Sequence, residues 1–472
     1  MTKPISSFSP LDPSSTEPIY RQIYWRFRGA ITDGVLTPGD RIPAARALAK
    51  ELGLARGTID TAYSLLTAEG YIQSRGQAGT VVAPGINVRA PTTPAEQTFS
   101  PVKNTSVRNK APVLPFQMAL PALDAFPRKI WAQIGARCVR ATRIPDMANP
   151  SVYGLESLRT AIATYLQVAR GITCSPAQVF ITSGYRNTLT LIAHALLKPG
   201  DQVLVEDPGY PPTRELLEHL QIQVAPVPVD QDGMLVSQGV NSAPEARAVV
   251  VTPAHQSPLS VSLSLPRRLE LLEWASRQQA WIVEDDYDGE YRYISRPLPA
   301  LKSLDRDGRV LYAGTFSKVL FPGIRLGYLV VPQAQVERFE HVSQTFLGNC
   351  PELTQAIVAT FLTEGHFARH IQRMRKLYGE RREATARGLK KALGDHISID
   401  AQPGGMHLIL RLTDQQSDRA LADRMREAGI YAEALSGWST VGQTHSGLML
   451  GFANIDSQDT AEQLGKRILA LL

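Results

Sequence analysis

The chain has 472 residues, enough by length for two or three domains, and its lysines and arginines (50) exceed its aspartates and glutamates (44) by six. This mild positive charge permits nucleic-acid binding without requiring it. Three widely spaced cysteines argue against a disulfide framework or a zinc cluster, and no apolar run is long enough to cross a membrane. With no signal-peptide pattern after Met1, we expect a soluble cytoplasmic protein with no membrane partner and no metal site.

Three helices followed by a hairpin are predicted at the start of the chain. Apolar residues that recur at intervals of three and four predict helices over residues 17–33, 44–52 and 56–69, and Gly53 and Gly70 end the last two. Residues 71–75 and 80–83, joined by a glycine-containing turn, are typical of a short hairpin. This order predicts a winged helix-turn-helix domain over residues 1–84, whose partner is double-stranded DNA.

The third predicted helix begins with polar and basic side chains. Its first turn is therefore able to enter a major groove and to meet phosphates with both charge and backbone N–H groups. The predicted DNA contacts are Arg46, Arg56, Gly57, Thr58 and Tyr63, together with Arg75 and Gln77 on the hairpin. Spacing alone leaves an alternative, in which the domain docks on its own protein and the polar residues are ordinary surface positions.

A proline-rich stretch separates this domain from the rest of the chain. Residues 85–114 carry prolines among polar and basic residues with little periodicity, which predicts a semi-extended linker. Residues 115–472 then alternate helical patterns with short apolar segments, at 202–205, 248–251, 281–283, 310–312 and 328–331. Buried strands between helices predict an α/β domain with a largely parallel sheet.

The run Gly314-Thr315-Phe316-Ser317-Lys318, followed by Arg325, is the most informative motif of this second domain. A lysine beside small hydroxyl residues suits an amine that holds an aldehyde cofactor as a Schiff base. The hydroxyls and the guanidinium of the following arginine suit a phosphate group. The motif therefore predicts pyridoxal 5'-phosphate as the cofactor.

Other strand ends of the second domain fit the same cofactor. Asp285 and Tyr287 follow a predicted strand, where an aspartate keeps a pyridine nitrogen protonated and a tyrosine donates to the ring oxygen. Ser183, Gly184 and Tyr185 precede a predicted helix whose N-terminus suits a phosphate. Taken singly, these patterns also occur in magnesium sites, surface loops and plain helix caps.

Two further side chains follow neighbouring strands. Tyr210 is placed to stack on a cofactor ring, and His255 is placed to face the same pocket. The alternatives are that the tyrosine belongs to the core or the rim and that the histidine makes structural hydrogen bonds.

Several of these segments resemble known families. DRIP at 40–43, RALA at 46–49, RGTI at 56–59 and EGY at 69–71 resemble the GntR-type winged helix. GTFSK at 314–318, RLG at 325–327 and EDDYD at 284–288 resemble fold type I aminotransferases, which bind pyridoxal 5'-phosphate. The whole chain resembles MocR-type regulators, the GntR subfamily that includes regulators of GABA use. The resemblance implies the cofactor roles given above, and a head-to-tail homodimer that reads an operator with paired half-sites.

The chain also departs from the aminotransferase pattern. Met449 stands where aminotransferases commonly carry an arginine that clamps a substrate carboxylate, and Ser257 and Arg186 replace a frequent asparagine and glutamine. We therefore expect a transcription regulator that senses an amine or amino-acid-like effector, or the cofactor level. The alternatives are a catalytic aminotransferase with an accessory winged helix, and a DNA-binding scaffold without cofactor.

Overall fold

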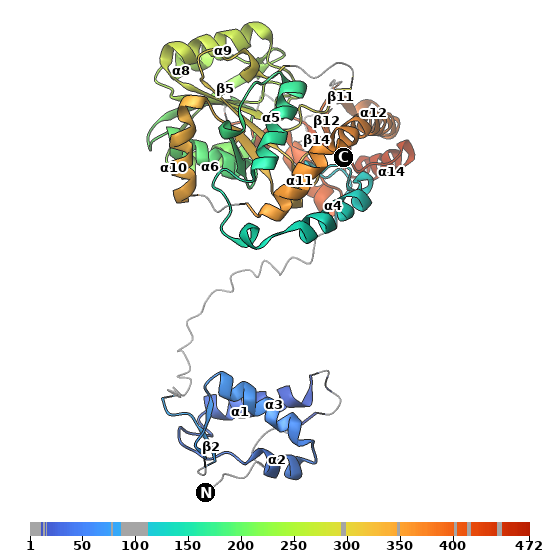
Figure 1. Cartoon of the computed structure of the whole chain (residues 1–472). Coiled ribbons are helices and arrows are strands. Elements are labelled where there is room, and N and C mark those ends of the chain that lie inside the picture. Colours follow the sequence, from blue (N-terminus) through green and yellow to red (C-terminus); the bar gives the residue numbers. More distant parts are fainter. Residues whose placement is uncertain are drawn as a thin grey trace. The chain divides into compact units, whose positions relative to one another are not determined.

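The structure, a computed structural model, describes residues 11–12, 15, 17–76, 79–85, 112–293, 299–346, 350–400, 404–412, 417–440 and 446–472. The chain divides into two compact units, Met1–Ala111 and Pro112–Leu472 (Figure 1). Most of the linker predicted over residues 85–114 lies outside the described residues, because these end at residue 85 and resume at residue 112.

The first unit contains the predicted three helices and hairpin in the predicted order. Its elements are α1 (Ile19–Thr32), α2 (Ala45–Leu52), α3 (Arg56–Ala68), β1 (Ile72–Ser74) and β2 (Thr80–Val82). The two strands pair antiparallel, with Ile72 opposite Val82. Apolar residues from all three helices and from the hairpin form one core, which fixes α2 and α3 as the helix-turn-helix.

The second unit is built on a mixed eight-stranded sheet, in the order β3-β10-β9-β8-β7-β4-β5-β6. The strands are β3 (Val179–Thr182), β4 (Gln202–Asp207), β5 (Gln223–Asp230), β6 (Gly233–Met234), β7 (Ala248–Val251), β8 (Trp281–Asp286), β9 (Val310–Thr315) and β10 (Gly327–Val330). The central strands from β5 to β9 pair in parallel, as predicted. Strand β10 runs antiparallel to both β3 and β9, so the sheet is not parallel throughout.

Helices cover both faces of this sheet because successive strand residues point to opposite sides. Val203 and Val205 of β4 join the cluster of α6 (Tyr185–Leu196), α7 (Pro211–His219) and α10 (Val336–Phe346). Leu204, between them, joins the cluster of α8 (Val236–Ser242) and α9 (Leu265–Gln278). The remaining helices before the C-terminal part are α4 (Arg128–Ala141), α5 (Glu156–Arg170) and α11 (Glu352–Thr363).

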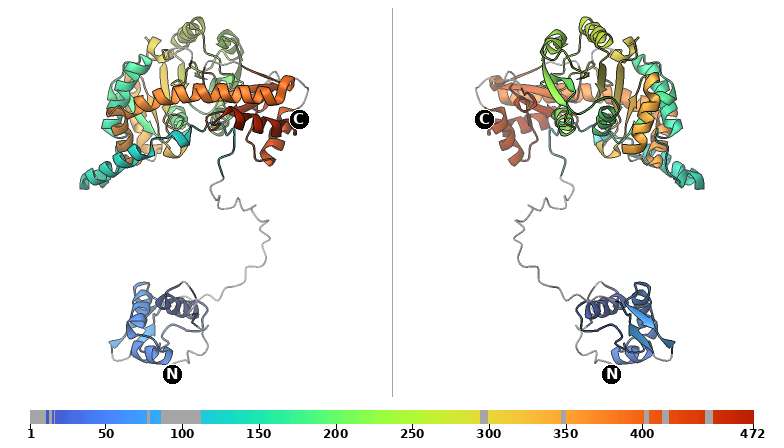
Figure 2. Two further views of the ribbon diagram at one scale, coloured as in Figure 1. Left: turned by 90° about the vertical axis from the view of Figure 1, so that its right-hand side faces the viewer. Right: turned by 90° about the vertical axis from the view of Figure 1, so that its left-hand side faces the viewer.

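A second, smaller sheet follows in the C-terminal part of this unit, which the sequence patterns did not predict. It is antiparallel, in the order β11-β12-β14-β13, with β11 (Ile397–Ile399), β12 (His407–Leu412), β13 (Glu433–Ala434) and β14 (Leu448–Gly451). The helices here are α12 (His366–Leu393), α13 (Asp418–Glu427) and α14 (Gln458–Leu469). Figure 2 shows α12 as one long straight helix across the unit.

Candidate cofactor pocket and DNA-binding face

The predicted cofactor residues meet at one edge of the large sheet. The carboxyl ends of β4, β7, β8 and β9 lie at this edge because these strands are parallel. Strand β3 ends there too, since it is antiparallel to β10, which is itself antiparallel to β9. Five strand ends therefore deliver loops to one place, the usual location of ligand sites in α/β sheets.

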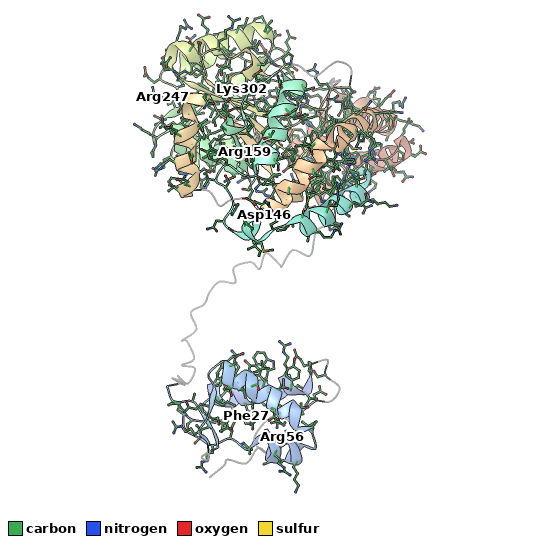
Figure 3. All side chains as sticks on the ribbon, in the orientation of Figure 1. Phe27, Arg56, Asp146, Arg159, Arg247 and Lys302 are labelled. Atoms are coloured by element: carbon green, nitrogen blue, oxygen red, sulfur yellow. The ribbon has the colours of Figure 1, made fainter. Side chains whose placement is uncertain are left out.

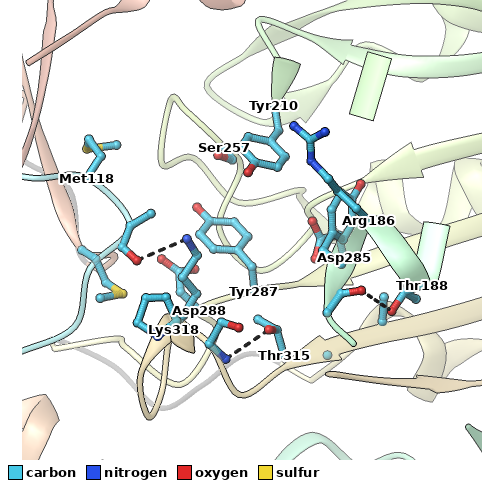
Figure 4. A pocket seen from close by; sticks show the side chains of 18 of the residues that line it. Met118, Arg186, Thr188, Tyr210, Ser257, Asp285, Tyr287, Asp288, Thr315 and Lys318 are labelled. Carbon is cyan, nitrogen blue, oxygen red and sulfur yellow. Dashed lines mark hydrogen bonds between the residues drawn. The ribbon is translucent and has the colours of Figure 1, made fainter. Parts of the chain in front are cut away.

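A cavity of about 250 Å³ opens at this edge (Figure 4). Of the residues predicted to face the cofactor, all except Ser183 and His255 line it: Gly184, Tyr185, Tyr210, Asp285, Tyr287, Thr315, Ser317, Lys318 and Arg325. Ser183 instead precedes the lining residues, and its backbone N–H donates to Asn187 Oδ1 at 3.0 Å. The side chains that line this cavity therefore decide whether the cofactor fits.

Lys318 lies in the loop after β9 and points into the cavity. Its Nζ donates to the carbonyl oxygen of Ala119 at 3.4 Å. Burial lowers the pKa of the Lys318 ammonium, and the carboxylates of Asp288 and Asp285 oppose that shift in part. A lowered pKa raises the neutral fraction of the amine, which is the form that bonds an aldehyde.

Asp285 lies across the cavity from Lys318, at the end of β8 (Figure 4). It is 9% exposed, and burial together with the neighbouring Asp286 raises the pKa of its carboxyl group. Within the described part of the chain, no hydrogen bond to this carboxylate is found. A buried carboxylate without a donor that faces a cavity suits a protonated ring nitrogen, because the ion pair would restore its charge.

His255 connects two of the pocket's side chains. Its Nδ1 lies 3.0 Å from Asp288 Oδ1 and 3.0 Å from the Tyr287 hydroxyl. A carboxylate only accepts, so Nδ1 carries the proton and donates to Asp288. Nδ1 then has no lone pair for the phenol, and the hydroxyl proton of Tyr287 is free to point into the cavity. This arrangement suits a phenol that donates to a ring oxygen.

The N-terminus of α6 forms another side of the cavity. Its cap residue, Gly184, has φ of 107°, and no side chain caps the helix. A Cβ on Gly327 would lie 3.2 Å from the Gly184 Cα and 3.0 Å from the Gly314 carbonyl oxygen, so the close approach of β10, β9 and the start of α6 favours glycine at position 327. Arg325 and Ser317 line the same cavity. Free helix N–H groups, a hydroxyl and a guanidinium suit a phosphate, and the whole donor set therefore fits pyridoxal 5'-phosphate.

A buried ion network lies behind the cavity and fixes the end of β8. Arg170, at the end of α5, contacts Asp286 Oδ2 with its Nε at 2.6 Å and Glu290 Oε1 with its Nη2 at 3.0 Å. The hydroxyl of Tyr312 also donates to Asp286 Oδ2, at 2.6 Å. These contacts hold Asp286 away from the cavity, and its neighbour Asp285 consequently faces into it.

Several lining residues were missed by sequence reasoning. Met118, Met406, His407 and Trp438 all line the cavity, although they come from segments far from the cofactor motifs. Apolar and aromatic residues of this kind carry no local signal, because the same types fill every core. Arg186 also lines the cavity, and its guanidinium lies 3.6 Å from Glu215.

In the first unit, most predicted DNA contacts lie on the surface. The exposed ones are Arg46, Arg56, Gly57 and Arg75, and Thr58 is half-buried. Arg56 is labelled among the side chains of this unit in Figure 3. The side chain of Arg56 is ion-paired with Asp60 at 3.3 Å. Gln77 lies outside the described residues.

Tyr63 requires a correction. It is 8% exposed, its hydroxyl donates to the Pro43 carbonyl oxygen at 2.9 Å, and its ring packs edge-on against Phe27. A side chain with its ring in the core and its hydroxyl already bonded has nothing left to offer a phosphate. We therefore assign Tyr63 to the core of the first unit and remove it from the DNA contacts.

None of the helices described is long and apolar enough to span a bilayer. No cluster of three or more histidine, cysteine, aspartate or glutamate side chains suited to a metal ion was found in the described part.

Comparison with known families matches both units. Residues 19–82 match the bacterial regulatory proteins of the gntR family, and residues 145–463 match aminotransferase class I and II. Among solved structures, kynurenine aminotransferase of Pyrococcus horikoshii is 27% identical with a TM-score of 0.69, covering 77% of this chain and 91% of that one. The aminotransferase LysN of Thermus thermophilus, solved with N-(5'-phosphopyridoxyl)-L-leucine, is 26% identical with a TM-score of 0.69, covering 76% of this chain and 92% of that one.

Relatives that cover nearly the full length carry both units. A probable rhizopine catabolism regulatory protein, MocR of Rhizobium meliloti, is 35% identical over 98% of this chain and 95% of its own length. The pyridoxine biosynthesis regulator PdxR of Corynebacterium glutamicum is 32% identical over 95% of each chain. The domain match and the donor set of the pocket identify pyridoxal 5'-phosphate as the cofactor. The chain therefore belongs to the MocR-type GntR regulators, in which a winged helix-turn-helix precedes a fold type I aminotransferase-like domain.

Proposed function

We propose that this regulator binds operator DNA through its first unit and uses its aminotransferase-like unit as a sensor of an amine effector or of the cofactor level. The observation that carries the proposal is the meeting of Lys318, Asp285 and the uncapped N-terminus of α6 in one cavity. That cavity belongs to a chain whose other unit is a GntR-type DNA-binding domain.

One group of pocket residues would hold the cofactor's phosphate, and a second group would hold its ring. Arg325, Ser317 and the first turn of α6 would hold the phosphate, and Asp285 would hold the ring nitrogen. Tyr287 would donate to the ring oxygen, and Tyr210, whose ring lines the cavity, would cover the ring face. When bound, the cofactor supplies an aldehyde that bonds primary amines and a ring that withdraws electrons.

Lys318 supplies the amine of this chain that the aldehyde would meet. Burial keeps a larger share of it neutral than in an exposed lysine, and the Ala119 carbonyl orients its Nζ. An effector amine that competes for the same aldehyde would change which groups fill the pocket. For such a change to alter DNA affinity, the chain must have two conformations that bind DNA with different affinities. These two conformations must also differ in their affinity for the effector.

Paired DNA-binding heads would follow from a head-to-tail homodimer, the assembly that the family resemblance implies. Two linked heads bind an operator with two half-sites far more tightly than one half-site, because the second contact is intramolecular. Small changes in how the heads are presented would then have large effects on operator affinity.

A catalytic aminotransferase is the second candidate, because Lys318 and Asp285 also suit turnover. Against it, Met449 on β14 is 0% exposed and lies in an apolar cluster, where it offers no charge to a substrate carboxylate. Incubation with amino acids and keto acids distinguishes the two candidates. Sustained multiple turnovers would favour the enzyme, and at most a single half-reaction would favour the sensor.

The test of the proposal is a covalent one. Cofactor added to the purified protein should produce a visible absorption band, and borohydride reduction followed by peptide mass spectrometry should place a pyridoxyl adduct on Lys318. Lys302 is the internal control, because burial lowers its pKa as well but its Nζ donates to Val310 rather than facing the cavity. An adduct on Lys302 alone, or none at all, would contradict the proposal.

Two variants separate loss of the amine from loss of the fold. Lys318→Ala and Lys318→Arg should both lack the band and the adduct, while their circular dichroism spectra stay those of the unaltered protein. Retention of the band in either variant would show that another amine holds the cofactor.

A further inference from the structure

The lining of the cavity includes three large apolar side chains, Met118, Met406 and Trp438. Figure 4 places Met118 on the Lys318 side, with Arg186 on the opposite side near Asp285. A molecule that enters beside Lys318 therefore meets the Met118 thioether, in a cavity that a second thioether and an indole ring also line.

The apolar character continues behind these side chains. Trp438 belongs to a buried cluster with Val229, Leu259, Ile409, Leu435 and Met449, and Met118 packs against the same cluster. Met449 is held at its centre by strand pairing, since β14 places it opposite Ile409 of β12 and Glu433 of β13.

The charges around the Lys318 end are negative. The carboxylates of Asp288, Asp285 and Glu433 all act to raise the pKa of Lys318. Asp288 is 2% exposed, and its buried Oδ2 has no hydrogen-bond partner among the described residues. Glu433 does not line the cavity itself, but its Oε2 accepts from Nε1 of the lining residue Trp438 at 3.2 Å. A carboxylate brought to this end would face like charges at close range.

The remaining basic side chains that line the cavity are neutral, are assigned to the phosphate or lie on the side opposite Lys318. His407 donates from Nε2 to the Pro258 carbonyl oxygen at 2.9 Å, and burial and the neighbouring His255 lower its pKa to about 4. Among the described lining residues, the two arginines are Arg186, which is paired with Glu215, and Arg325, which is assigned to the phosphate. No cation is left for a ligand carboxylate at the Lys318 end of the described pocket.

We infer that the effector class of this pocket is a primary amine with an apolar body and no carboxylate. The inference rests on the proposed function, because it concerns a ligand that enters beside the bound cofactor. It follows from the match between such an amine and the lining of the cavity: the ammonium group finds Asp288, and the hydrocarbon body finds Met118, Met406 and Trp438. An amino acid of the same size makes the same apolar contacts and adds an unfavourable charge.

Matched ligand pairs test the inference on the cofactor-loaded full chain. Phenethylamine and phenylalanine form one pair, and isoamylamine and leucine form the other, since each pair differs in the carboxylate alone. Isothermal titration calorimetry should find each amine bound roughly tenfold or more tightly than its amino acid, from the cost of juxtaposing like charges. Equal or tighter binding of the amino acids would overturn the inference, and so would the absence of binding by all four ligands.

A variant designed to reverse the preference for amines over amino acids provides a second test. Met118 is half-buried in the lining, so Met118→Arg introduces a cation where a ligand carboxylate would lie, and Met118→Leu is its apolar control. The arginine variant should shift the preference toward the amino acids by tenfold or more, whereas the leucine variant should keep the preference of the unaltered protein. An unchanged preference in the arginine variant, with its cofactor band intact, would contradict the inference.

The cofactor band recorded before each titration keeps the two proposals apart. Its absence in the unaltered protein would count against the proposed function. Its presence together with preferred binding of amino acids would leave the proposed function standing and remove the effector class.

Discussion

At the scale of single residues, burial acts in opposite directions on the two ionisable groups that face each other in the pocket. It lowers the pKa of Lys318 and raises that of Asp285, and each group partly offsets the shift of the other. Without a ring nitrogen between them, both groups are driven toward their neutral forms. A protonated pyridine nitrogen would stabilise the charged form of Asp285. The cofactor would therefore supply the donor that this buried carboxylate lacks among the described residues.

Replacing Asp285 should therefore have two separate effects, one on the affinity for the cofactor and one on the pKa of Lys318. Asp285→Asn removes a charge-assisted bond worth about 1.5–3 kcal/mol, so cofactor affinity should fall roughly 10- to 150-fold. The substitution also removes a carboxylate that raises the pKa of Lys318, so that pKa should fall further and the neutral amine should persist to lower pH. Rates of cofactor uptake by the apo protein, measured against pH, should accordingly show a midpoint below that of the unaltered protein.

The conservative variant checks the cause of the shift. Asp285→Glu keeps the negative charge and should keep the pH midpoint closer to its original value, even where the longer side chain lowers affinity. A midpoint that rises in the asparagine variant would contradict the assigned direction of the coupling.

At the scale of elements, α12 fixes the loops that carry the site. His370 Nε2 donates to the carbonyl oxygen of Val319, next to Lys318, at 2.9 Å. Burial lowers the pKa of His370 to about 4, so this contact is made by a neutral ring. The Tyr378 hydroxyl accepts from the backbone N–H of Ala122, just beyond the Met118 loop, at 2.9 Å. One helix therefore holds both the amine and the Met118 loop, and α14 packs against that helix.

Two glycines on α12 provide a matched pair for this packing. A Cβ on Gly388 would lie 2.5 Å from the Gln458 carbonyl oxygen and 2.6 Å from Ala461 Cβ of α14, whereas a Cβ on Gly379 would meet its nearest atoms at 4.0 Å. Gly388→Ala should lower the free energy of unfolding by about 1–3 kcal/mol through overpacking. Gly379→Ala should change it little or raise it by up to about 1 kcal/mol. Denaturant unfolding of both variants measures the difference, and equal effects would contradict close packing of α12 on α14.

At the scale of the whole molecule, the two units have different tasks, which the family match assigns to DNA and to the cofactor. The DNA-binding unit presents the exposed arginines Arg46, Arg56 and Arg75 among its predicted contacts, so we expect its affinity to depend on a few phosphate contacts per head. Pairing of two heads in a homodimer would multiply these weak contacts, and the sensor unit would then regulate binding by how the heads are held.

Removal of Arg56 should test this dependence on the full chain. In a dimer, Arg56→Ala removes a phosphate contact from each head, so the salt slope of binding to an operator with two half-sites should decrease by about 2. Affinity should fall for all sequences alike, as measured by fluorescence anisotropy over a salt series. Arg277→Ala is the matched control, because the exposed side chains of Arg277 and Glu273 pair at 3.9 Å on α9 of the other unit. An unchanged slope in the Arg56 variant would remove this residue from the interface.

Short-range patterns in the sequence determined the elements and the cofactor. Glycine stops, apolar periodicity and the run from Gly314 to Lys318 are local signals, and the helices, the central strands and the pyridoxal phosphate prediction followed from them. Departures such as Met449 were visible as well, because a single replaced residue stands out in a recognised motif.

Tertiary structure decided what the local patterns left open. Tyr63 and Tyr210 are both aromatic residues near a predicted site, yet one is 8% and the other 40% exposed, because burial depends on what packs around each residue. Met118, Met406 and Trp438 reach the cavity from three distant segments, and the neutral His407 and the buried Asp288 take their character from that packing. The sequence therefore determined which cofactor this protein binds, and the packing of remote segments decided the surroundings of Lys318, since the dielectric and charge around that amine exist only in the folded chain.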